Sequence, residues 1–477
     1  MERHIHHSTG ESGALSLRAE SSAIMQIARH LHRSPPARKM ARMAHGSLTT
    51  RSIAAILAGI VLAVAAQGFA ESRSKSRQKT ELGPPPATRI DVTPLGYVAP
   101  SRFYLVARLS SATLDFIDKD HLLFTFREGG LLQRVPSDPR EDDDQVICAV
   151  VLDIPTGQVV ERAKWRMHDR ERYLWAIGDG HFLVRQRNAL YLTDSHLGLR
   201  PYMQVDTQLQ ALSVAPDRKL MMVEYQKYEP PAADSNGLDA TTRRPPPTLG
   251  DPSPPSARPV STQILMVRTQ DNMLIAKSEV GHAVDVPLLQ NGFLEVLEGS
   301  RPDEWVIRNK PFSGQPSTIA GFKSACDPTV TTLSDTVALA VGCIGGSNDH
   351  SVTAYSMNGS ILWQDRWQSR YIWPTFEFAE NGSRFAYGSL EVNHSIGTMD
   401  PFGEDDVVAQ MVGVFDTDTG KLELVKTATP ILSAGHNYAL SADGSRFAIL
   451  RNDAIEVYDL PPAPALPPAA IAKATPK

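Results

Sequence analysis

The chain has 477 residues and a nearly balanced charge, with 48 Lys and Arg against 53 Asp and Glu and a formal net charge of −5. Apolar residues make up 42% of it, and it holds 3 cysteines beside 35 prolines and 32 glycines. This composition excludes a collagen, a disulfide-rich scaffold, a coiled coil and a polytopic membrane protein. The lack of a basic surplus argues against nucleic-acid binding.

The N-terminal region has the pattern of a targeting segment. Residues 53–66 form the longest apolar run, IAAILAGIVLAVAA, with Arg42 and Arg51 before it and a polar stretch after it. A basic segment, a short apolar segment and a small-x-small site are typical of a secretory signal peptide. We therefore expect 40–70 to be a signal peptide that is cleaved after Ala70. An uncleaved membrane anchor is the alternative, although a spanning helix needs about 20 apolar residues.

Residues 1–39 precede this segment, and we interpret them as a disordered leader or as sequence upstream of a true start at Met40 or Met43. Beyond Ala70 the chain carries 40 basic and 50 acidic residues, a net charge of −10. Such a protein suits an exported, soluble state. The expectation is a periplasmic or secreted monomer with no nucleic-acid partner, in contact with a membrane only through an uncleaved anchor.

A polar, Pro-rich stretch, 71–95, reads as a linker. The region 96–460 then repeats one pattern, a short apolar strand, a tight polar turn and a second strand. Seven copies align, at 115–127, 174–186, 211–225, 287–298, 330–342, 376–389 and 438–450. Turn pairs such as Asn381-Gly382 and Asp443-Gly444 accept the positive φ of hairpin turns. Second hairpins usually follow, as at 150–163, 264–278, 354–365 and 412–425.

Two hairpins make one four-stranded antiparallel unit, and all-β repetition at about 40–60 residues is typical of a β-propeller. The fold class predicted is thus all-β, a propeller of seven blades. A merged pair at 287–342 would reduce the count to six, and a missed unit before residue 115 would raise it to eight. The last copy supplies three strands, so we expect 102–109, RFYLVARL, to add the fourth and close the ring from both termini.

The pattern S-x-D-G-S-R-F-A at Ser441–Ala448 has an echo at Ala379–Ala386, and D-x-x-T-G-x occurs at Asp153–Gln158 and Asp416–Lys421. With these motifs the chain resembles the β-propeller superfamily of WD-repeat, YVTN-type and quinoprotein-like proteins over about 96–460. The Trp-Asp strand ending of WD repeats is absent, as is the Trp that follows the Thr-Gly turn in most quinoprotein units. The resemblance therefore implies a fold rather than a ligand.

Three segments interrupt or follow the repeats. Residues 227–262 hold 9 prolines and almost no large apolar side chain, so they cannot bury enough surface to order themselves. We expect a disordered insertion there, a shorter loop at 392–408, and a disordered Pro/Ala-rich tail at 461–477.

The three cysteines are Cys148, Cys326 and Cys343. In an oxidising compartment two of them should pair. Cys326 and Cys343 flank a strand-like segment that can fold back as a hairpin, so they are the predicted disulfide. Cys148 lies in a buried-strand pattern, and we interpret it as an inert core thiol.

A search for catalytic signatures finds no nucleophile elbow, zinc motif, Walker loop or dinucleotide fingerprint. No catalytic, cofactor or metal residue is therefore assigned. Several weaker candidates are interpreted as structural or solvated groups. We expect Trp363, Trp367 and Trp373 to pack in the core, and Glu141–Asp144 and Glu404–Asp406, the latter beside His394, to lie in polar loops. His181 and Asn348–His350 are interpreted as turn residues. No cofactor is predicted, and calcium and pyrroloquinoline quinone stay open.

The function that we expect is a non-catalytic scaffold in the cell envelope that binds an unknown protein or small ligand. Function in propellers is added to the loops rather than implied by the fold. One alternative is a quinoprotein-like or lyase-type enzyme, which clustered carboxylates and His at one mouth of the central channel would favour. The other is an envelope assembly factor, which an apolar, aromatic patch at one rim would favour.

Overall fold

The computed structural model describes residues 81–99, 112–128, 145–167, 172–207, 209–228, 259–395 and 403–462. These residues belong to one compact unit, Glu81–Lys477. The expected leader and signal peptide lie outside the described residues, as does all but the start of the expected tail. Within the described ranges, no helix is long and apolar enough to cross a bilayer.

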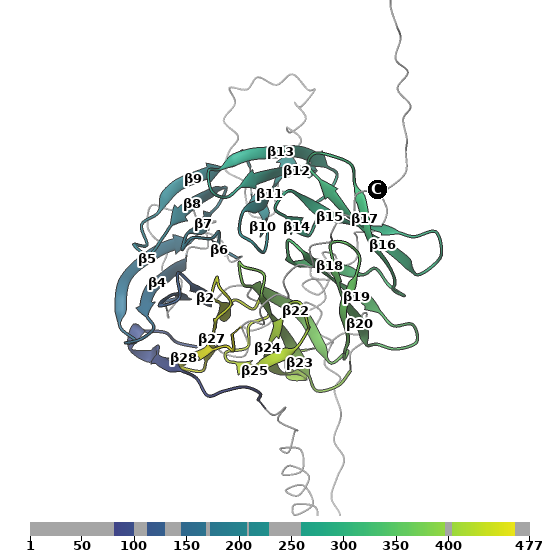
Figure 1. Cartoon of the computed structure of the whole chain (residues 1–477). Coiled ribbons are helices and arrows are strands. Elements are labelled where there is room, and N and C mark those ends of the chain that lie inside the picture. The colour runs from purple at the N-terminus through teal and green to yellow at the C-terminus, as the bar shows by residue number, and fades with distance from the viewer. Residues whose placement is uncertain are drawn as a thin grey trace, which may run out of the picture. The chain divides into compact units, whose positions relative to one another are not determined.

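The described residues form seven antiparallel sheets of four strands each, which are the blades of a propeller (Figure 1). Blade 1 has β2 (Ala112–Phe116), β3 (His121–Arg127), β4 (Gln145–Asp153) and β5 (Val159–Met167). Blade 2 has β6 (Leu174–Ala176), β7 (Phe182–Gln186), β8 (Ala189–Thr193) and β9 (Arg200–Gln204), and blade 3 has β10 (Leu209–Val214), β11 (Leu220–Tyr228), β12 (Pro259–Arg268) and β13 (Met273–Val280). All seven predicted hairpins, and hence the predicted blade count, are confirmed.

The second half of the ring follows the same plan. Blade 4 has β14 (Leu288–Leu289), β15 (Gly292–Glu298), β16 (Glu304–Pro311) and β17 (Ser317–Lys323), and blade 5 has β18 (Thr329–Ser334), β19 (Val337–Cys343), β20 (His350–Ser356) and β21 (Ile361–Trp367). Blade 6 has β22 (Tyr371–Phe378), β23 (Arg384–Val392), β24 (Val407–Asp416) and β25 (Leu422–Ala428). Blade 7 joins β26 (Tyr438–Leu440), β27 (Arg446–Arg451) and β28 (Ala454–Asp459) to β1 (Thr88–Asp91), and the short 3-10 helices η1 (Thr93–Leu95) and η3 (Glu404–Asp406) complete the elements.

The first strand of each blade lies innermost and the fourth lies at the outside of the ring (Figure 1). Antiparallel strands alternate in direction, so the turn between the first and second strands of every blade reaches the same end of the ring. We call these seven connections the inner turns. They place the turn residues of distant parts of the sequence around one axis.

The core consists of layers between neighbouring blades, because inner strands such as β3 and β11 are buried on both faces. In β3, for example, Leu122 and Phe124 pack toward blade 7, whereas Leu123 packs with Phe182 of blade 2. Equivalent buried clusters fill each of the other five junctions. A single four-stranded sheet could not cover both faces, and stacking around a ring solves that problem.

The closing strand differs from the prediction. Thr88–Asp91 pairs antiparallel with β28, with Ile90 opposite Ile455, so the fourth strand of blade 7 comes from the expected linker 71–95. The expectation that 102–109 closes the ring is wrong, and that segment lies outside the described residues. The four-residue β1 succeeds because Ile90 is buried against blades 7 and 1, while its other side chains tolerate an edge position.

The bounds of the insertions also need correction. Strand β11 continues to Tyr228 and β12 begins at Pro259, where the two strands pair, so the expected insertion 227–262 begins and ends inside the sheet of blade 3. Residues 229–258 lie outside the described residues. In the expected loop 392–408, Val392 pairs with Val407, so part of that stretch is strand as well.

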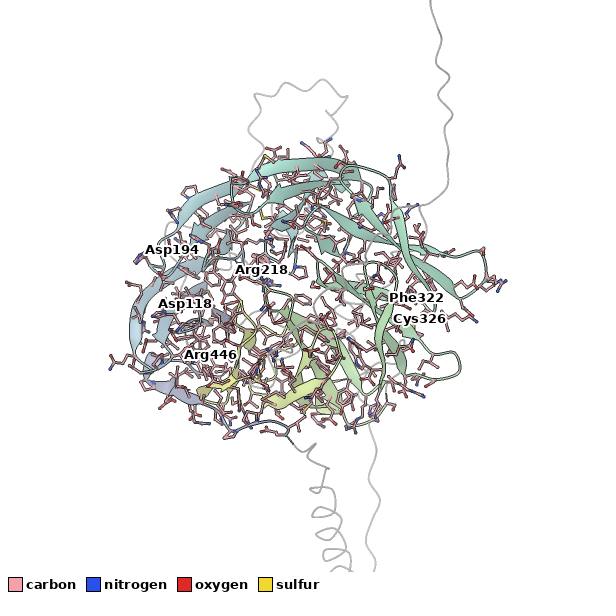
Figure 2. All side chains as sticks on the ribbon, viewed as in Figure 1. Asp118, Asp194, Arg218, Phe322, Cys326 and Arg446 are labelled. Atoms are coloured by element: carbon pink, nitrogen blue, oxygen red, sulfur yellow. A yellow bond between two sulfur atoms is a disulfide. The ribbon has the colours of Figure 1, made fainter. Side chains whose placement is uncertain are left out.

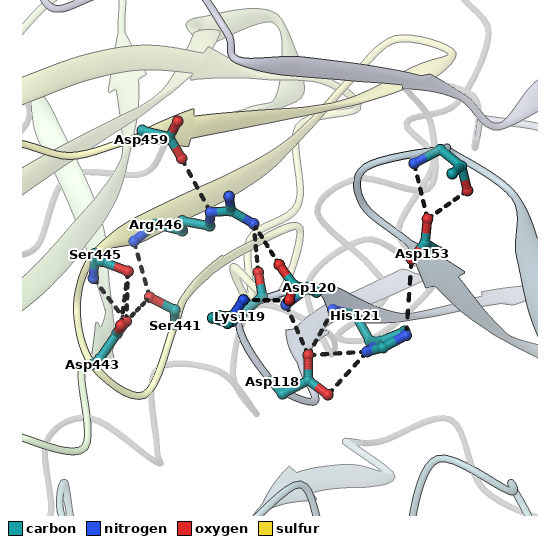
Figure 3. A network of polar contacts seen from close by, with 11 residues as sticks. Asp118, Lys119, Asp120, His121, Asp153, Ser441, Asp443, Ser445, Arg446 and Asp459 are labelled. Atoms are coloured by element: carbon teal, nitrogen blue, oxygen red, sulfur yellow. Dashed lines mark hydrogen bonds and ion pairs between the residues drawn. The ribbon is translucent and has the colours of Figure 1, made fainter.

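A polar network joins blade 7 to blade 1 at the seam of the ring (Figure 3). The guanidinium of Arg446 donates to the carbonyl of Lys119 at 2.6 Å and lies 3.4 Å from the carboxylate of Asp120. Its Nε also donates to Asp459 at 3.0 Å. The network shows that the S-R-F-A motif of blade 7 reaches the next blade as well as forming its own strand.

Arg384, the matching residue of blade 6, makes the same kind of bridge to blade 7 but is buried. Only 1% of its side chain is exposed, and its Nε donates to Glu423 at 2.6 Å. Its Nη1 donates to the carbonyl of Gly444 at 2.8 Å, and its Nη2 donates to the carbonyl of Pro461. Every nitrogen of this guanidinium has an acceptor, so Arg384 is a fully satisfied buried cation.

Candidate functional site

Five charged or titratable side chains from five different blades meet at the ring axis. We call Asp115, Arg172, Arg218, Glu377 and His436 the axial cluster. They come from β2, from the residue two positions before β6, from the inner turn of blade 3, from β22 and from the residue two positions before β26. Side chains of blades 1, 2, 3, 6 and 7 can interact with one another only where the inner strands converge, and Figure 2 shows Arg218 inside the ring.

Glu377 is the centre of the cluster. Its two carboxylate oxygens lie 3.6 Å from a guanidinium nitrogen of Arg218 and 3.8 Å from Nδ1 of His436. All three side chains are between 13% and 14% exposed, so they are largely buried and yet remain in contact with solvent. Arg172 is held nearby, because its Nε donates to the Leu174 carbonyl at 3.1 Å.

Arg218 occupies a backbone position that favours glycine. The inner turns of blades 3, 6 and 7 share one hydrogen-bond pattern, in which Arg218, Gly382 and Gly444 take the same place. Their φ values are 61°, 71° and 69°. A left-handed conformation is costly for a residue with a Cβ, and such positions cluster at functional sites. Blade 3 thus accepts local strain to place a guanidinium at the axis.

Arg218 is also incompletely bonded. Its Nε is buried and has no hydrogen-bond partner in the structure, and its contact with Glu377 is longer than a hydrogen bond at 3.6 Å. Buried polar groups are nearly always bonded in folded proteins, and each exception requires an explanation. A ligand that accepts hydrogen bonds from this guanidinium provides one.

Burial and neighbouring charges divide the carboxyl groups of the cluster into two states. Burial raises the pKa of Asp115 to about 8, and the negative charge of Glu377 adds to this effect against the opposing Arg172 and Arg218. Burial also acts on Glu377, but His436 and the two arginines together hold its pKa below the usual value. Near pH 7 Asp115 is therefore mostly protonated, and Glu377 is ionised.

His436 is neutral near pH 7. Burial lowers its pKa, the charge of Arg172 lowers it further, and Glu377 opposes both effects. Two guanidinium groups then face a single ionised carboxylate, Glu377, within the axial cluster, so the five side chains of the cluster together carry a net positive charge. Asp115 adds a neutral carboxyl that can donate a hydrogen bond.

Four carboxylates surround the axis at the level of the inner turns. We call Asp179, Asp217, Asp335 and Glu380 the rim acids, and they belong to the turns of blades 2, 3, 5 and 6. Burial raises the pKa of Glu380, and the charges of Asp179 and Asp217 add to this effect against that of Arg218. The rim is thus negative and adjoins the positive interior of the cluster.

Asp217 is a largely buried rim acid, with 10% of its side chain exposed. Its Oδ1 accepts from the backbone of Lys219, as Asn381 and Asp443 accept from their own turns. Its Oδ2 has no hydrogen-bond partner, and Lys219, 3.7 Å away, is 61% exposed. Burial and the neighbouring carboxylate of Asp335 raise the pKa of Asp217.

None of the residues singled out from the sequence belongs to the axial cluster or to the rim acids. Trp363 and Trp367 pack in the core between blades 5 and 6, and Trp363 donates to the Thr417 carbonyl at 2.8 Å. His394 lies 3.8 Å from Asp406. Trp373 packs beside Leu390, His181 lies in the inner turn of blade 2, and Asp349 binds Arg366.

No group of three or more His, Cys, Asp or Glu among the described residues is arranged to hold a metal ion. The acidic run Glu141–Asp144 lies outside those residues. Calcium and pyrroloquinoline quinone therefore gain no supporting observation in the part of the chain that the structure covers.

Cys326 and Cys343 form a disulfide with their Cα atoms 5.5 Å apart, and Cys148 is a buried free thiol. A hollow of about 430 Å³ lies beside the disulfide, lined by residues 298–305 and 324–327. It involves only blade 4 and its connection to blade 5. The axial cluster, which combines charged groups of five blades, is the stronger candidate for a site.

Sequence reasoning missed the axial cluster because no spacing links residues from five blades. One signal was available. When the seven hairpins are aligned, ALSVAPDRKL of blade 3 has Arg218 where YALSADGSRF of blade 7 has Gly444. A long cation in the place of a turn glycine marks an exception to the repeat.

Comparisons with known proteins identify no family for the chain. No protein-family model and no curated protein matches the chain. Among solved structures it is similar to the acylaminoacyl peptidase of Pyrococcus horikoshii, at 10% identity and a TM-score of 0.43 over 75% of this chain and 53% of that one. It is also similar to the β-propeller domain of the Trilobed protease from Pyrococcus furiosus, at 9% identity and a TM-score of 0.39 over 74% and 94% of the two chains.

The C-terminal WD40 domain of Sif2 also matches, at 9% identity and a TM-score of 0.33, over 74% of this chain and 98% of that domain. The chain spans about half the length of the acylaminoacyl peptidase. The seven four-stranded sheets make the protein a seven-bladed β-propeller.

Proposed function

We propose that this propeller is a non-catalytic binding module that holds a small ligand at the ring axis. The observation that carries the proposal is Arg218, a guanidinium in a glycine position with its buried Nε unbonded. A purely structural arginine of this protein, Arg384, has every nitrogen bonded. An unsatisfied and strained cation that is still in contact with solvent fits a role in binding.

The proposal includes export, because the run at 53–66 and the small-x-small site before residue 71 have the pattern of a signal peptide. The protein would act as a monomer in the periplasm or outside the cell, without a nucleic-acid partner and without a resident cofactor. A net charge of −10 beyond residue 70 supports solubility and disfavours polyanionic partners.

The test is a thermal-shift screen of the full chain against amino acids, carboxylates, amines, sugars, calcium and pyrroloquinoline quinone. A ligand that binds only the folded state raises the melting temperature by mass action. We expect at least one small molecule to raise it in the wild type and not in Arg218→Gly. The matched control is Arg187→Gly, which removes an exposed arginine at φ 56° from a turn outside the cluster. A hit that shifts all three proteins equally would overturn the proposal.

An enzyme of the lyase type is the second candidate, and the clustered carboxyls and His436 favour it. Asp115 is held protonated near pH 7 and could act as a general acid, while neutral His436, paired with Glu377, could act as a base. Turnover of a ligand found in the screen would distinguish the two functions. Asp115→Asn would then abolish turnover while leaving binding.

The assembly-factor alternative gains no such observation. The large apolar side chains that are exposed among the described residues are all aliphatic or Met. They form no aromatic patch at one rim.

A further inference from the structure

We propose that the ligand of the axial cluster is a small zwitterion, with its carboxylate bound by Arg172 and Arg218 and its ammonium group bound by the rim acids. This inference rests on the proposed function, because it names the class of molecule for the same site. It follows from three observations on charge, bonding and spacing along the axis.

The interior of the cluster suits a carboxylate. Arg172 and Arg218 are two guanidinium groups that share one ionised partner, Glu377. The buried Nε of Arg218 is an unused donor, and a guanidinium binds a carboxylate through parallel hydrogen bonds. The Asp115 carboxyl adjoins the same charges and can donate a further hydrogen bond in its protonated form.

The rim excludes a simple anion. A molecule that approaches from the end of the inner turns first meets the carboxylates of Asp179, Asp217, Asp335 and Glu380, which would repel a negative charge. The hairpin requires only one oxygen of Asp217, because Asn381 performs the same turn role in blade 6. Its second oxygen has no hydrogen-bond partner in a side chain that is 10% exposed, and the ammonium group of Lys219, 61% exposed, lies 3.7 Å from it. An ammonium group of the ligand would supply the missing hydrogen bond.

The axial cluster and the rim acids are close enough together for one small molecule to contact both. Glu377 and Glu380 belong to the same inner strand and turn and are three residues apart, which corresponds to about 10 Å at most along an extended chain. Gly178 lies beside a member of each group. A Cβ on this glycine would lie 3.3 Å from Cβ of Arg218, in the axial cluster, and 3.5 Å from a carboxylate oxygen of Glu380, a rim acid. A ligand whose amine and carboxylate are separated by several bonds would therefore reach both.

The experiment is a titration of the full chain by calorimetry with 6-aminohexanoate, hexanoate and hexylamine, which differ only in their charged ends. A series of shorter ω-amino acids, down to 4-aminobutyrate, would measure the spacing. We expect one zwitterion of the series to bind at least tenfold more tightly than hexanoate or hexylamine. Arg218→Gly should remove the advantage over hexylamine, and Asp217→Asn should remove the advantage over hexanoate.

Both substitutions introduce residues that the protein already uses at these turn positions, Asn381 and Gly382 in blade 6, so we expect both variants to fold. Arg187→Gly is the matched control and should bind like the wild type. If Asp217→Asn binds the zwitterion unchanged, Asp179→Asn tests the rim again, and no effect in either variant would overturn the role of the rim acids.

The outcomes separate this inference from the proposed function. Hexanoate or hexylamine binding as tightly as every zwitterion would overturn the inference and leave an axial site. A neutral sugar that shifts the wild type and not Arg218→Gly would do the same. If no probe of the series or of the wider screen depends on Arg218, both the inference and the proposed function fail.

Discussion

Two buried arginines of this propeller have opposite environments. Arg384 bridges blades 6 and 7, is 1% exposed, and has an acceptor for each nitrogen. Arg218 lies at the axis, is 13% exposed, and leaves its Nε unbonded on a left-handed backbone. Removing a fully bonded buried cation leaves its partners unpaired and destabilises a fold, whereas an incompletely bonded cation is itself a cost to stability and needs another explanation. The comparison separates the framework of the ring from its site.

The largest expected effect is the loss of Arg384. Arg384→Ala leaves the Glu423 carboxylate, which is 6% exposed, without its partner and removes the bond to the Gly444 carbonyl. Breaking a buried ion pair from one side costs about 3–5 kcal/mol. The free energy of unfolding in urea should fall by that amount. Arg366→Ala removes a pair whose arginine is 58% exposed and should change it by less than about 1 kcal/mol.

A loss below about 1 kcal/mol for Arg384→Ala would show that burial and complete bonding do not identify a structural arginine here. The contrast with Arg218 would then lose its basis.

The fold was predictable because the repeat is local. Each hairpin combines a turn pair such as Asn381-Gly382 with flanking apolar strands, and seven such signals fix the number of blades. The closing strand was missed because its pairing with β28 joins residues more than 360 positions apart, and TRID contains a single apolar residue, Ile90. The more apolar 102–109 gave the stronger local signal, and strand pairing is decided by tertiary context.

The site was less predictable for a related reason. Asp115, Arg172, Glu377 and His436 are ordinary residues in their own blades, and only closure of the ring brings them together. Arg218 alone departs from the repeat. An alignment of the inner turns could have found it, but the other members follow from three-dimensional structure.

The second effect concerns pH and tests whether the axial environment raises the pKa of Asp115. An aspartate ionises near pH 4 in the unfolded chain, whereas Asp115 stays protonated in the folded protein up to about pH 8. Its ionisation therefore makes wild-type stability fall as pH rises from about 4 to 8. Asp115→Asn lacks this loss, so its stability relative to the wild type should increase over that range, by about 1–3 kcal/mol in a site that water still reaches.

Urea unfolding at pH 5 and pH 8 measures this difference. Asp153→Asn is the control, because hydrogen bonds from Thr156 lower the pKa of Asp153 and its titration is complete below pH 5. The opposing outcome is that the free energies of unfolding of Asp115→Asn and the wild type differ by the same amount at both pH values. That result would show that Asp115 ionises normally and that the axial environment does not raise its pKa.

The seam between blades 7 and 1 should give a smaller effect. Arg446 makes bonds like those of Arg384, but its side chain is 27% exposed and its partner Asp459 is 60% exposed. Arg446→Ala should therefore lower the free energy of unfolding by about 1–2 kcal/mol, mainly through the lost bond to the Lys119 carbonyl. In Arg446→Ala, amide hydrogen exchange should be faster in β1 and β28 than in β23. If Arg446→Ala and Arg384→Ala lowered the free energy of unfolding by equal amounts, solvent exposure would not determine how much each of these arginines contributes to stability.

The smallest effect on stability is expected for Arg218→Gly. Glycine relieves the left-handed backbone, a gain of about 1 kcal/mol, and removes an unbonded buried nitrogen. The lost attraction to Glu377 opposes this gain, although His436 and Arg172 still face that carboxylate. The net change in the free energy of unfolding should stay within about 1 kcal/mol, measured in urea beside the binding titrations.

A substitution in the opposite direction, from glycine to a residue with a Cβ, tests the equivalent turn position of blade 7. Gly444→Ala places a Cβ 2.5 Å from Oγ of Ser383 at a positive φ, so it should destabilise the fold by more than Arg218→Gly does. Glycine is required at the junction of blades 6 and 7 and is avoided at the equivalent position of blade 3. If Arg218→Gly instead lost several kcal/mol, Arg218 would be a structural bridge like Arg384, and the case for a ligand at the axis would rest on the rim alone.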